Sequence, residues 1–158
     1  MESFRGRFTN KIDAKGRVSV PAKFRAIVTA QGMNGIICSP SFKGAYLDAG
    51  GPAYGDMLDQ MINRLGMFSD AHDKLAAALY GESQDLSMDG DGRIILPEDM
   101  RAHANITADA TFVGFGARFQ IWNPQAYEAF RADAFGDAKT FADLLQPENA
   151  VKPTGGGA

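Results

Sequence analysis

Two short segments of the sequence place an aspartate and an arginine four residues apart around a glycine. The first pair is Asp13 and Arg17, and the second is Asp89 and Arg93. A planar guanidinium on a tight turn can form two parallel hydrogen bonds, either with a carboxylate or with O6 and N7 of a guanine. Two interpretations are therefore open for each pair. Either the arginine contacts a nucleic acid while the aspartate orients it, or the two side chains simply pair across their own turn.

The spacing within each segment is that of a tight turn. An aspartate at the first position can bond to the backbone two residues on, and a glycine at the fourth position takes the left-handed conformation that closes the turn. We therefore predict a hairpin turn in each segment. The residues in these structural roles are Asp13 and Gly16 in the first segment, and Asp89 and Gly92 in the second.

The two segments belong to a longer internal repeat with an offset of 76 residues, in which residues 12–26 align with residues 88–102. Each copy continues from its turn into a short apolar strand and then into a helix that starts at Pro21 or Pro97, because proline is favoured at the first helical position. A second pair of strands and a further helix follow in both copies. The sequence thus predicts an α+β fold, rich in β-structure, in which two β-β-α-β-β-α modules form one compact protomer.

The repeat also sets the predicted boundaries within the chain. The first module covers residues 1–81 and contains extra helices, and the second covers residues 82–146. A short amphipathic segment at residues 137–145 is expected to end the fold. Residues 147–158, which finish in a proline and a run of glycines, are predicted to form a disordered tail.

The extra helices of the first module carry apolar side chains at helical spacing. One helix starts at Pro52 and includes Met57 and Met61, and another covers residues 70–80. Stripes of this kind are more often core than cofactor site. A methionine-rich subunit contact is the alternative.

The composition limits the chemistry that the chain can perform. With 45% hydrophobic and 22% charged residues, it is typical of a soluble globular protein. It has neither a membrane-spanning apolar run nor an apolar N-terminal signal stretch, so we expect a cytoplasmic protein with no membrane partner. Cys38, the single cysteine, is expected to pack in a strand, and with His72 and His103 it does not make a zinc set. No metal and no cofactor are expected.

Charge is distributed unevenly along the chain. The formal net charge is −3, but residues 1–30 carry seven basic side chains against two acidic ones, a charge of +5, which leaves −8 for the remainder. A polyanion responds to the local field and not to the net charge. The basic segment therefore favours a nucleic-acid contact at the first turn, with a solvated basic terminus as the alternative.

The turn segments, with their short strands and proline-started helices, resemble the paired DxxxR motifs of the MraZ family. The start of the chain matches that family's opening, through Phe4-Arg5-Gly6, Ile12-Asp13-x-Lys15-Gly16-Arg17 and Pro21-x-x-Phe24-Arg25, and residues 4–145 are covered. The resemblance implies two modules like those of the AbrB and SpoVT group of DNA-binding proteins, and a homo-oligomeric ring. It also implies a nucleoid-associated bacterial transcriptional regulator, not an enzyme, that binds direct repeats in the promoter of the cell-division and cell-wall gene cluster.

The resemblance also assigns roles to single residues. In the family the arginine of the motif contacts DNA, a role that carries to Arg17 and to Arg93. The second turn has Asp91 where the first has Lys15, and a carboxylate there would repel a phosphate. We therefore expect the first turn to carry most of the DNA affinity and the second to be chiefly structural or to bind another surface. Side chains expected to neutralise phosphates are Lys15, Arg5, Arg7 and Lys11.

The sequence gives less support to a calcium-binding protein or an enzyme. Residues 85–90 resemble the start of a calcium-binding loop, but Leu96 stands where such a loop requires a glutamate. The sequence has no motif for a catalytic nucleophile, a nucleotide loop or a catalytic metal, so no catalytic residue is expected. The alternative to a DNA-binding regulator is an AbrB-like oligomeric interaction protein, or an antitoxin, whose acidic second half binds a protein partner.

Overall fold

The computed structural model describes residues 2–147, and the chain divides into two compact units, residues 1–124 and 125–158. The elements of the first repeat are β1 (Arg7–Lys11), β2 (Arg17–Ser19), α1 (Ala22–Ala30), β3 (Gly35–Pro40), β4 (Leu47–Gly50), α2 (Pro52–Ile62), α3 (Asp70–Ala76) and the π-helical turn η1 (Ala77–Gly81). Those that follow are β5 (Gln84–Ser87), β6 (Arg93–Ile95), α4 (Glu98–His103), β7 (Asp109–Phe115), β8 (Arg118–Trp122), α5 (Pro124–Phe141) and the 3-10 turn η2 (Ala142–Leu145). All but the first residue of the predicted tail, residues 147–158, lie outside the described part of the chain.

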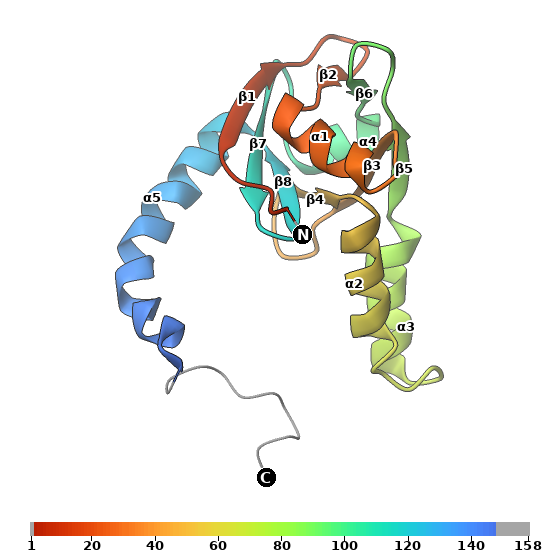
Figure 1. Cartoon of the computed structure of the whole chain (residues 1–158), viewed down its shortest axis with the longest axis vertical. Helices are drawn as coiled ribbons and strands as arrows, with labels where there is room; N and C mark the ends of the chain where they lie inside the picture. The colour runs from red at the N-terminus through yellow and green to blue at the C-terminus, as the bar shows by residue number, and fades with distance from the viewer. Residues whose placement is uncertain (1, 148–158) are drawn as a thin grey trace. The chain divides into compact units, whose positions relative to one another are not determined.

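The strands of the two repeats interleave in one six-stranded antiparallel sheet, in the order β1-β7-β8-β4-β3-β5, and in a separate two-stranded ribbon, β2·β6 (Figure 1). The strand that precedes each turn pairs with the other repeat, since β1 lies beside β7 and β5 lies beside β3. β4 and β8 meet at the centre of the sheet. Each strand of the first repeat thus lies as far from one edge of the sheet as the equivalent strand of the second repeat lies from the other edge. The two repeats are therefore related by a local twofold. The predicted α+β class is confirmed.

The tight turns form as predicted, but the strands on either side of each turn separate. An isolated bridge joins Ile12, the residue after β1, to Val18 of β2, whereas β1 itself pairs with β7 in the large sheet. The strands separate because β2 pairs with β6, which buries Val18 and Ile94 together in the core. The helices α1 and α4 begin one residue after the predicted position, with Pro21 and Pro97 as N-caps.

The core is shared between the repeats. Phe24 of α1 packs on Phe4 and on Phe119, with ring centroids 5.3 and 5.0 Å apart, and Phe119 also contacts Phe112. All four rings are almost completely buried. Cys38 is fully buried in β3, as expected, and burial raises the pKa of its thiol well above the ordinary value. Because the aromatic cluster draws on both repeats, each repeat depends on the other for its packing.

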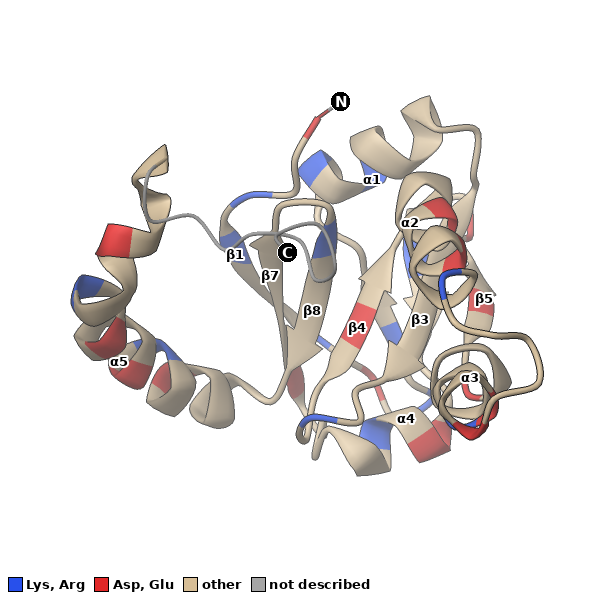
Figure 2. Ribbon diagram, turned by 90° about the horizontal axis from the view of Figure 1, so that it is seen from below, with Lys and Arg blue, Asp and Glu red and all other residues tan. Residues whose placement is uncertain are grey.

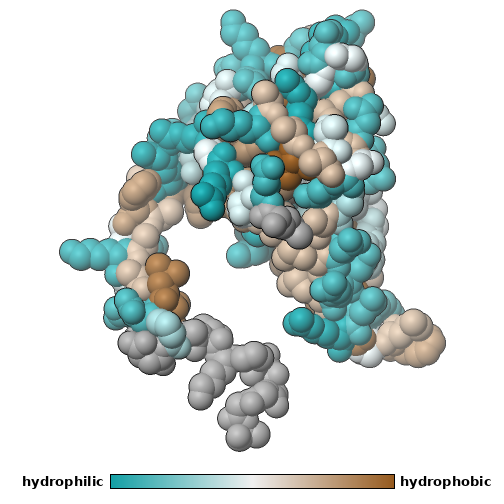
Figure 3. Space-filling model, viewed as in Figure 1, coloured by the Kyte–Doolittle hydropathy of each residue, from teal (hydrophilic) through white to brown (hydrophobic). Residues whose placement is uncertain are grey.

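The methionine-bearing helix departs from expectation. α2 buries Tyr54 and Ile62, but Met57 and Met61 are 40% and 56% exposed, so the predicted core stripe is wrong at these positions. Figure 1 shows that α2 starts at the sheet beside β4 and continues away from it beside α3, so much of its length has no sheet to pack against. At the turn between α2 and α3, Phe68 is 93% exposed. Figure 3 shows this turn as a hydrophobic tip.

The second unit consists mainly of α5 and η2. α5 starts at Pro124, as predicted, but it runs without a break to Phe141, so the separate segment expected at residues 137–145 is wrong in its boundaries. The three alanines of positions 131–139, together with Arg131 and Lys139, favour helix, and this carries the helix through Gly136. Among residues 2–147, no helix is both long and apolar enough to cross a membrane.

Candidate nucleic-acid interface

The first turn holds its aspartate and arginine in a defined arrangement. The carboxylate of Asp13 accepts hydrogen bonds from the backbone N–H groups of Lys15 and Arg17, both at 2.9 Å, and from Nε of Arg17 at 2.7 Å. Gly16 closes the turn with a φ of +87° and donates its N–H to the carbonyl oxygen of Asp13 at 3.0 Å. The ion pair engages the guanidinium through Nε, and 40% of the arginine side chain is exposed. Its terminal nitrogens therefore remain the part that an external acceptor can meet.

The second turn repeats this geometry with one addition. Asp89 accepts the N–H groups of Asp91 and Arg93 at 2.8 and 3.0 Å and Nε of Arg93 at 2.9 Å. Gly92 has a φ of +77°. In addition, a carboxylate oxygen of Asp91 lies 3.5 Å from Nη2 of Arg93. The terminal edge of this second arginine is thus already close to a second negative charge.

Hydrogen bonding keeps both turn aspartates charged. The backbone N–H of Arg17, followed by its side chain, lowers the pKa of Asp13. The backbone N–H of Arg93 is likewise the largest cause of the lowered pKa of Asp89. Both carboxylates are therefore ionised near neutral pH. In both copies the aspartate and the arginine form an ion pair across their own turn. An aspartate that orients its arginine toward a nucleic acid would have the same geometry.

The ribbon brings the two arginines to one surface. In the antiparallel register of β2 and β6, Val18 lies opposite Ile94, Ser19 opposite Arg93, and Arg17 opposite Ile95. Alternate residues of a strand point to opposite faces, so the buried Val18 and Ile94 face the core. The other face, which we call the ribbon face, carries the remaining four side chains, namely Arg17, Ser19, Arg93 and Ile95. Arg17 and Arg93 also line one surface hollow.

Each turn is braced by the opposite repeat. The guanidinium of Arg25, on α1, donates to the carbonyl oxygen of Val20 at 2.7 Å and packs so tightly against Gly92 that a Cβ on this glycine would lie 2.6 Å from Cδ of Arg25. Arg101, on α4, makes the equivalent bond to Leu96 at 3.0 Å and lies against Gly16. The repeat alignment shows that both arginines recur, but their crossed placement depends on the strand pairing and was not predicted.

A second pair of crossed bonds joins the turns through the backbone. The N–H of Val20 donates to the carbonyl oxygen of Gly92 at 3.0 Å, and the N–H of Leu96 donates to that of Gly16 at 2.8 Å. Each closing glycine is therefore held by the strand end of the other repeat. The two turns are therefore joined by hydrogen bonds into one unit and are not two independent loops.

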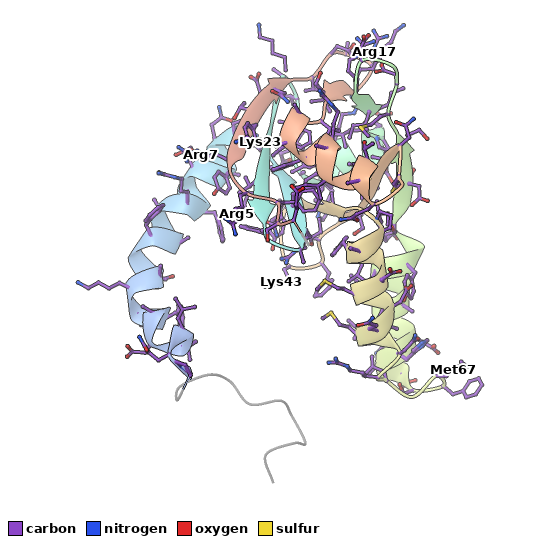
Figure 4. The ribbon with its side chains drawn as sticks, in the orientation of Figure 1. Arg5, Arg7, Arg17, Lys23, Lys43 and Met67 are labelled. Atoms are coloured by element: carbon purple, nitrogen blue, oxygen red, sulfur yellow. The ribbon has the colours of Figure 1, made fainter. Side chains whose placement is uncertain are left out.

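The other predicted phosphate contacts are spread over more than one surface. Lys11 lines the same hollow as the two ribbon arginines. Arg7 and Arg5 lie at and beyond the opposite end of β1, and Arg5 shares a different hollow with Lys23. Figure 4 shows Arg17 at one end of the first unit, apart from Arg5, Arg7 and Lys23. Figure 2 shows basic residues at β1 and α1 and acidic residues along α3 and α5. The charge of +5 that the sequence assigns to residues 1–30 is therefore divided between the ribbon and the outer side of β1 and α1.

The geometry of the second turn does not support a calcium-binding loop at residues 85–90. Asp89, which would be a ligand of such a loop, is occupied by the donors of its own turn. Within residues 2–147, no group of three His, Cys, Asp or Glu side chains is placed to hold a metal ion. The residues flanking the turn belong to β5 and β6, whereas a calcium loop of this type connects two helices.

Comparison with known proteins points to one family. A family model described as "MraZ protein, putative antitoxin-like" matches residues 79–146. A protein of Parvibaculum lavamentivorans named Transcriptional regulator MraZ is 52% identical over 159 residues, covering 99% of each chain. Proteins of the same name from Xanthobacter autotrophicus and Rickettsia akari are 42% and 41% identical. The first match covers 85% of each chain, and the second covers 81% of this chain and 86% of the relative.

Proposed function

Because the chain belongs to the MraZ family of transcriptional regulators, we propose that it regulates transcription by binding specific sequences of double-stranded DNA through the ribbon face. Membership of the family was predicted from the two turn segments and is confirmed. The observation that carries the proposal is the placement of Arg17 and Arg93 on one exposed face of a two-stranded ribbon, each oriented by an aspartate.

The ribbon has the dimensions and the chemistry for reading base edges. A two-stranded β-ribbon fits the major groove of B-DNA, where guanine presents O6 and N7 as a pair of acceptors. Arg17 and Arg93 can each use the terminal nitrogens for this bidentate contact, since Nε is taken by the aspartate of the turn. The crossed braces under the turns keep the ribbon rigid, which reduces the entropy lost on binding.

The two turns contribute unequally in this proposal. Lys15 is exposed at the first turn and neutralises a phosphate, with Lys11 beside the ribbon. Asp91 at the second turn competes for Arg93 and repels the backbone of the DNA. Arg17 therefore supplies more of the affinity than Arg93. Arg5 and Arg7 contact phosphates farther along the DNA, on the outer side of β1.

Affinity for an operator requires more than one ribbon. We propose that the protein is a homo-oligomer, a ring of identical subunits, and that several ribbons bind direct repeats in the promoter of the cell-division and cell-wall gene cluster. Linked ribbons bind repeated sites far more tightly than one ribbon binds one site. The exposed side chains of Met57, Met61 and Phe68 are suited to subunit contacts. This function places the protein in the cytoplasm, at the nucleoid.

The test is a gel-shift titration of the full chain with the promoter DNA upstream of its own gene. Arg17→Ala should abolish specific binding, because it removes the base contact of the stronger turn without touching the core. Lys74→Ala, which removes an equal charge on α3, should bind like the wild type. A circular dichroism melt checks that both variants fold. Undiminished operator binding by Arg17→Ala would refute the proposal.

A salt series separates phosphate contacts from base contacts. Lys15→Ala should lower the affinity and reduce the slope of log K against log salt by about one, because one released counterion is lost. Footprinting of the same promoter would locate the repeats.

A second function, binding of a protein partner in the manner of an antitoxin, is favoured by the hydrophobic tip between α2 and α3. The two functions differ in their dependence on the ribbon. If Arg17→Ala loses DNA binding in the gel shift yet controls a reporter promoter normally in cells, regulation proceeds through the partner and not through the operator.

A further inference from the structure

The ribbon face is not symmetric, although the backbone that carries it is. Ser19 and Ile95 are equivalent residues of the repeat, with the same offset of 76 that relates Arg17 to Arg93. One is a small hydroxyl and the other a branched apolar side chain. Ile95 is 58% exposed, whereas its neighbour in sequence, Ile94, is completely buried. One end of the ribbon face therefore presents Arg17 beside Ile95, and the other end presents Arg93 beside Ser19.

The position of Ile95 is set by the strand pairing and not by packing. It lies directly opposite Arg17 on β6, and it takes no part in the hydrophobic core of the first unit. Single exposed apolar residues are common on proteins. This one, however, lies at one end of the ribbon face, directly opposite Arg17, so DNA that approaches Arg17 on this face also approaches Ile95.

The spacing fits recognition of a neighbouring base. Side chains directly opposite each other on an antiparallel pair have Cβ atoms about 5 Å apart, and successive base pairs are stacked about 3.4 Å apart along the helix axis. A side chain opposite Arg17 therefore reaches the base pair one or two steps from the guanine that this arginine binds. The apolar feature of the major groove is the C5-methyl group of thymine, and small apolar side chains recognise it by contact.

We propose that Ile95 is a specificity-determining residue that contacts the methyl group of a thymine one or two base pairs from the guanine bound by Arg17. This inference rests on the proposed function. The serine at the equivalent position, Ser19, makes no such apolar contact beside Arg93. Each ribbon thus requires a thymine at one end of its recognition site and not at the other.

The experiment replaces thymine by uracil, which removes the methyl group and leaves the base pairing intact. Duplexes of the promoter fragment carry one uracil at each thymine position in turn, and the full-length protein is titrated against each. Substitution at one position per repeat should weaken binding about fourfold, the effect of uncovering one methyl-sized group. The other positions should bind as the unmodified duplex does.

Protein variants assign the effect to the side chain. Ile95→Ala should bind the unmodified and the uracil duplex equally, with an affinity close to that of the wild type on uracil. Ser19→Ala is the matched control on the other end and should retain the wild-type response. Ser19→Ile should create a second thymine preference beside Arg93. Because Ile95 and Ser19 lie on the ribbon face and not in the core, these substitutions should leave the fold unchanged. Thermal melts verify this.

The outcomes separate the inference from the function on which it rests. If the wild type fails to bind the promoter fragment, or binds it without need of Arg17, the proposed function itself is overturned. If binding depends on Arg17 but every uracil duplex binds as tightly as the thymine duplex, the function stands and the role of Ile95 is refuted. The same refutation follows if the uracil effect persists unchanged in Ile95→Ala.

Discussion

One carboxylate in each turn serves three donors, two from the backbone and one from a guanidinium. The same side chain therefore shapes the turn and aims the arginine. The side chains of Asp13 and Asp89 are 42% and 40% exposed, so solvent weakens the ion pair itself. The main contribution of the aspartate is the set of hydrogen bonds that it accepts within the turn, and these are stronger to the charged carboxylate than to the neutral acid.

The stability of the protein should therefore depend on pH through these two residues. The folded-state pKa of Asp13 and of Asp89 lies below the ordinary value of 3.8. Their contribution is thus complete above the unfolded pKa and is lost as the pH falls through the lower, folded value. In urea denaturation between pH 5 and pH 2, the midpoint of the wild type should fall more steeply below about pH 4 than that of the double variant Asp13→Asn, Asp89→Asn. Parallel curves would contradict this account.

At the scale of the element, the turns and the ribbon depend on close backbone approach. Gly16 has a left-handed φ, and a Cβ there would lie 2.6 Å from the carbonyl oxygen of Leu96 and 3.1 Å from Nε of Arg101. Gly90, also in a turn, has open space around it. The first glycine is required by a contact across the two repeats, and the second is not.

Substitution of these glycines should have unequal effects. Gly16→Ala combines an unfavourable φ with a clash against backbone and should lower the free energy of unfolding by about 2 kcal/mol or more. The corresponding fall in Tm is roughly 4–8 °C. Gly90→Ala should change Tm by less than about 2 °C. Differential scanning calorimetry of the two variants measures this, and equal losses would rule out the cross-repeat contact as the cause.

Turns and helix starts could be predicted from the sequence where neighbouring residues determine them. Asp13 and Gly16 predict the turn, which the structure confirms, and Pro21 predicts the start of α1 to within one residue. Prediction failed for Met57 and Met61, because their apolar character says nothing about how far α2 extends beyond the sheet. The long, unbroken α5 was likewise missed because helix propensity outweighed a single glycine.

At the scale of the whole molecule, the interleaving of the repeats could not be predicted from the sequence. The alignment at offset 76 identifies equivalent residues, but strand pairing decides which of them meet, and that depends on contacts between distant segments. The pairing of Ser19 with Arg93, and the placement of Arg25 under Gly92, both arise in this way. The turn arginines were predicted as candidates. Their shared face, and the positions of Ile95, Arg25 and Arg101, required the structure.

The same interleaving predicts that neither module folds alone. The predicted division at residues 81 and 82 would leave β1 without β7, and β5 without β3. Fragments 1–81 and 82–147, prepared separately, should show no cooperative thermal transition by circular dichroism. A stoichiometric mixture should regain the β-sheet signal and a single transition. Cooperative unfolding of either fragment alone at low concentration would show that the repeats are autonomous domains.

The local twofold relation of the ribbon has one more consequence. In a dimer of identical modules, every substitution is made twice, and the paired surfaces must stay alike. Here one polypeptide encodes both halves, so Lys15 and Asp91, or Ser19 and Ile95, were free to diverge while Val18 and Ile94 kept the scaffold in register. The DNA-binding surface proposed for the ribbon would be symmetric if its two halves were identical. With these differences it has two distinct ends, and such a surface suits target sites that all have the same orientation.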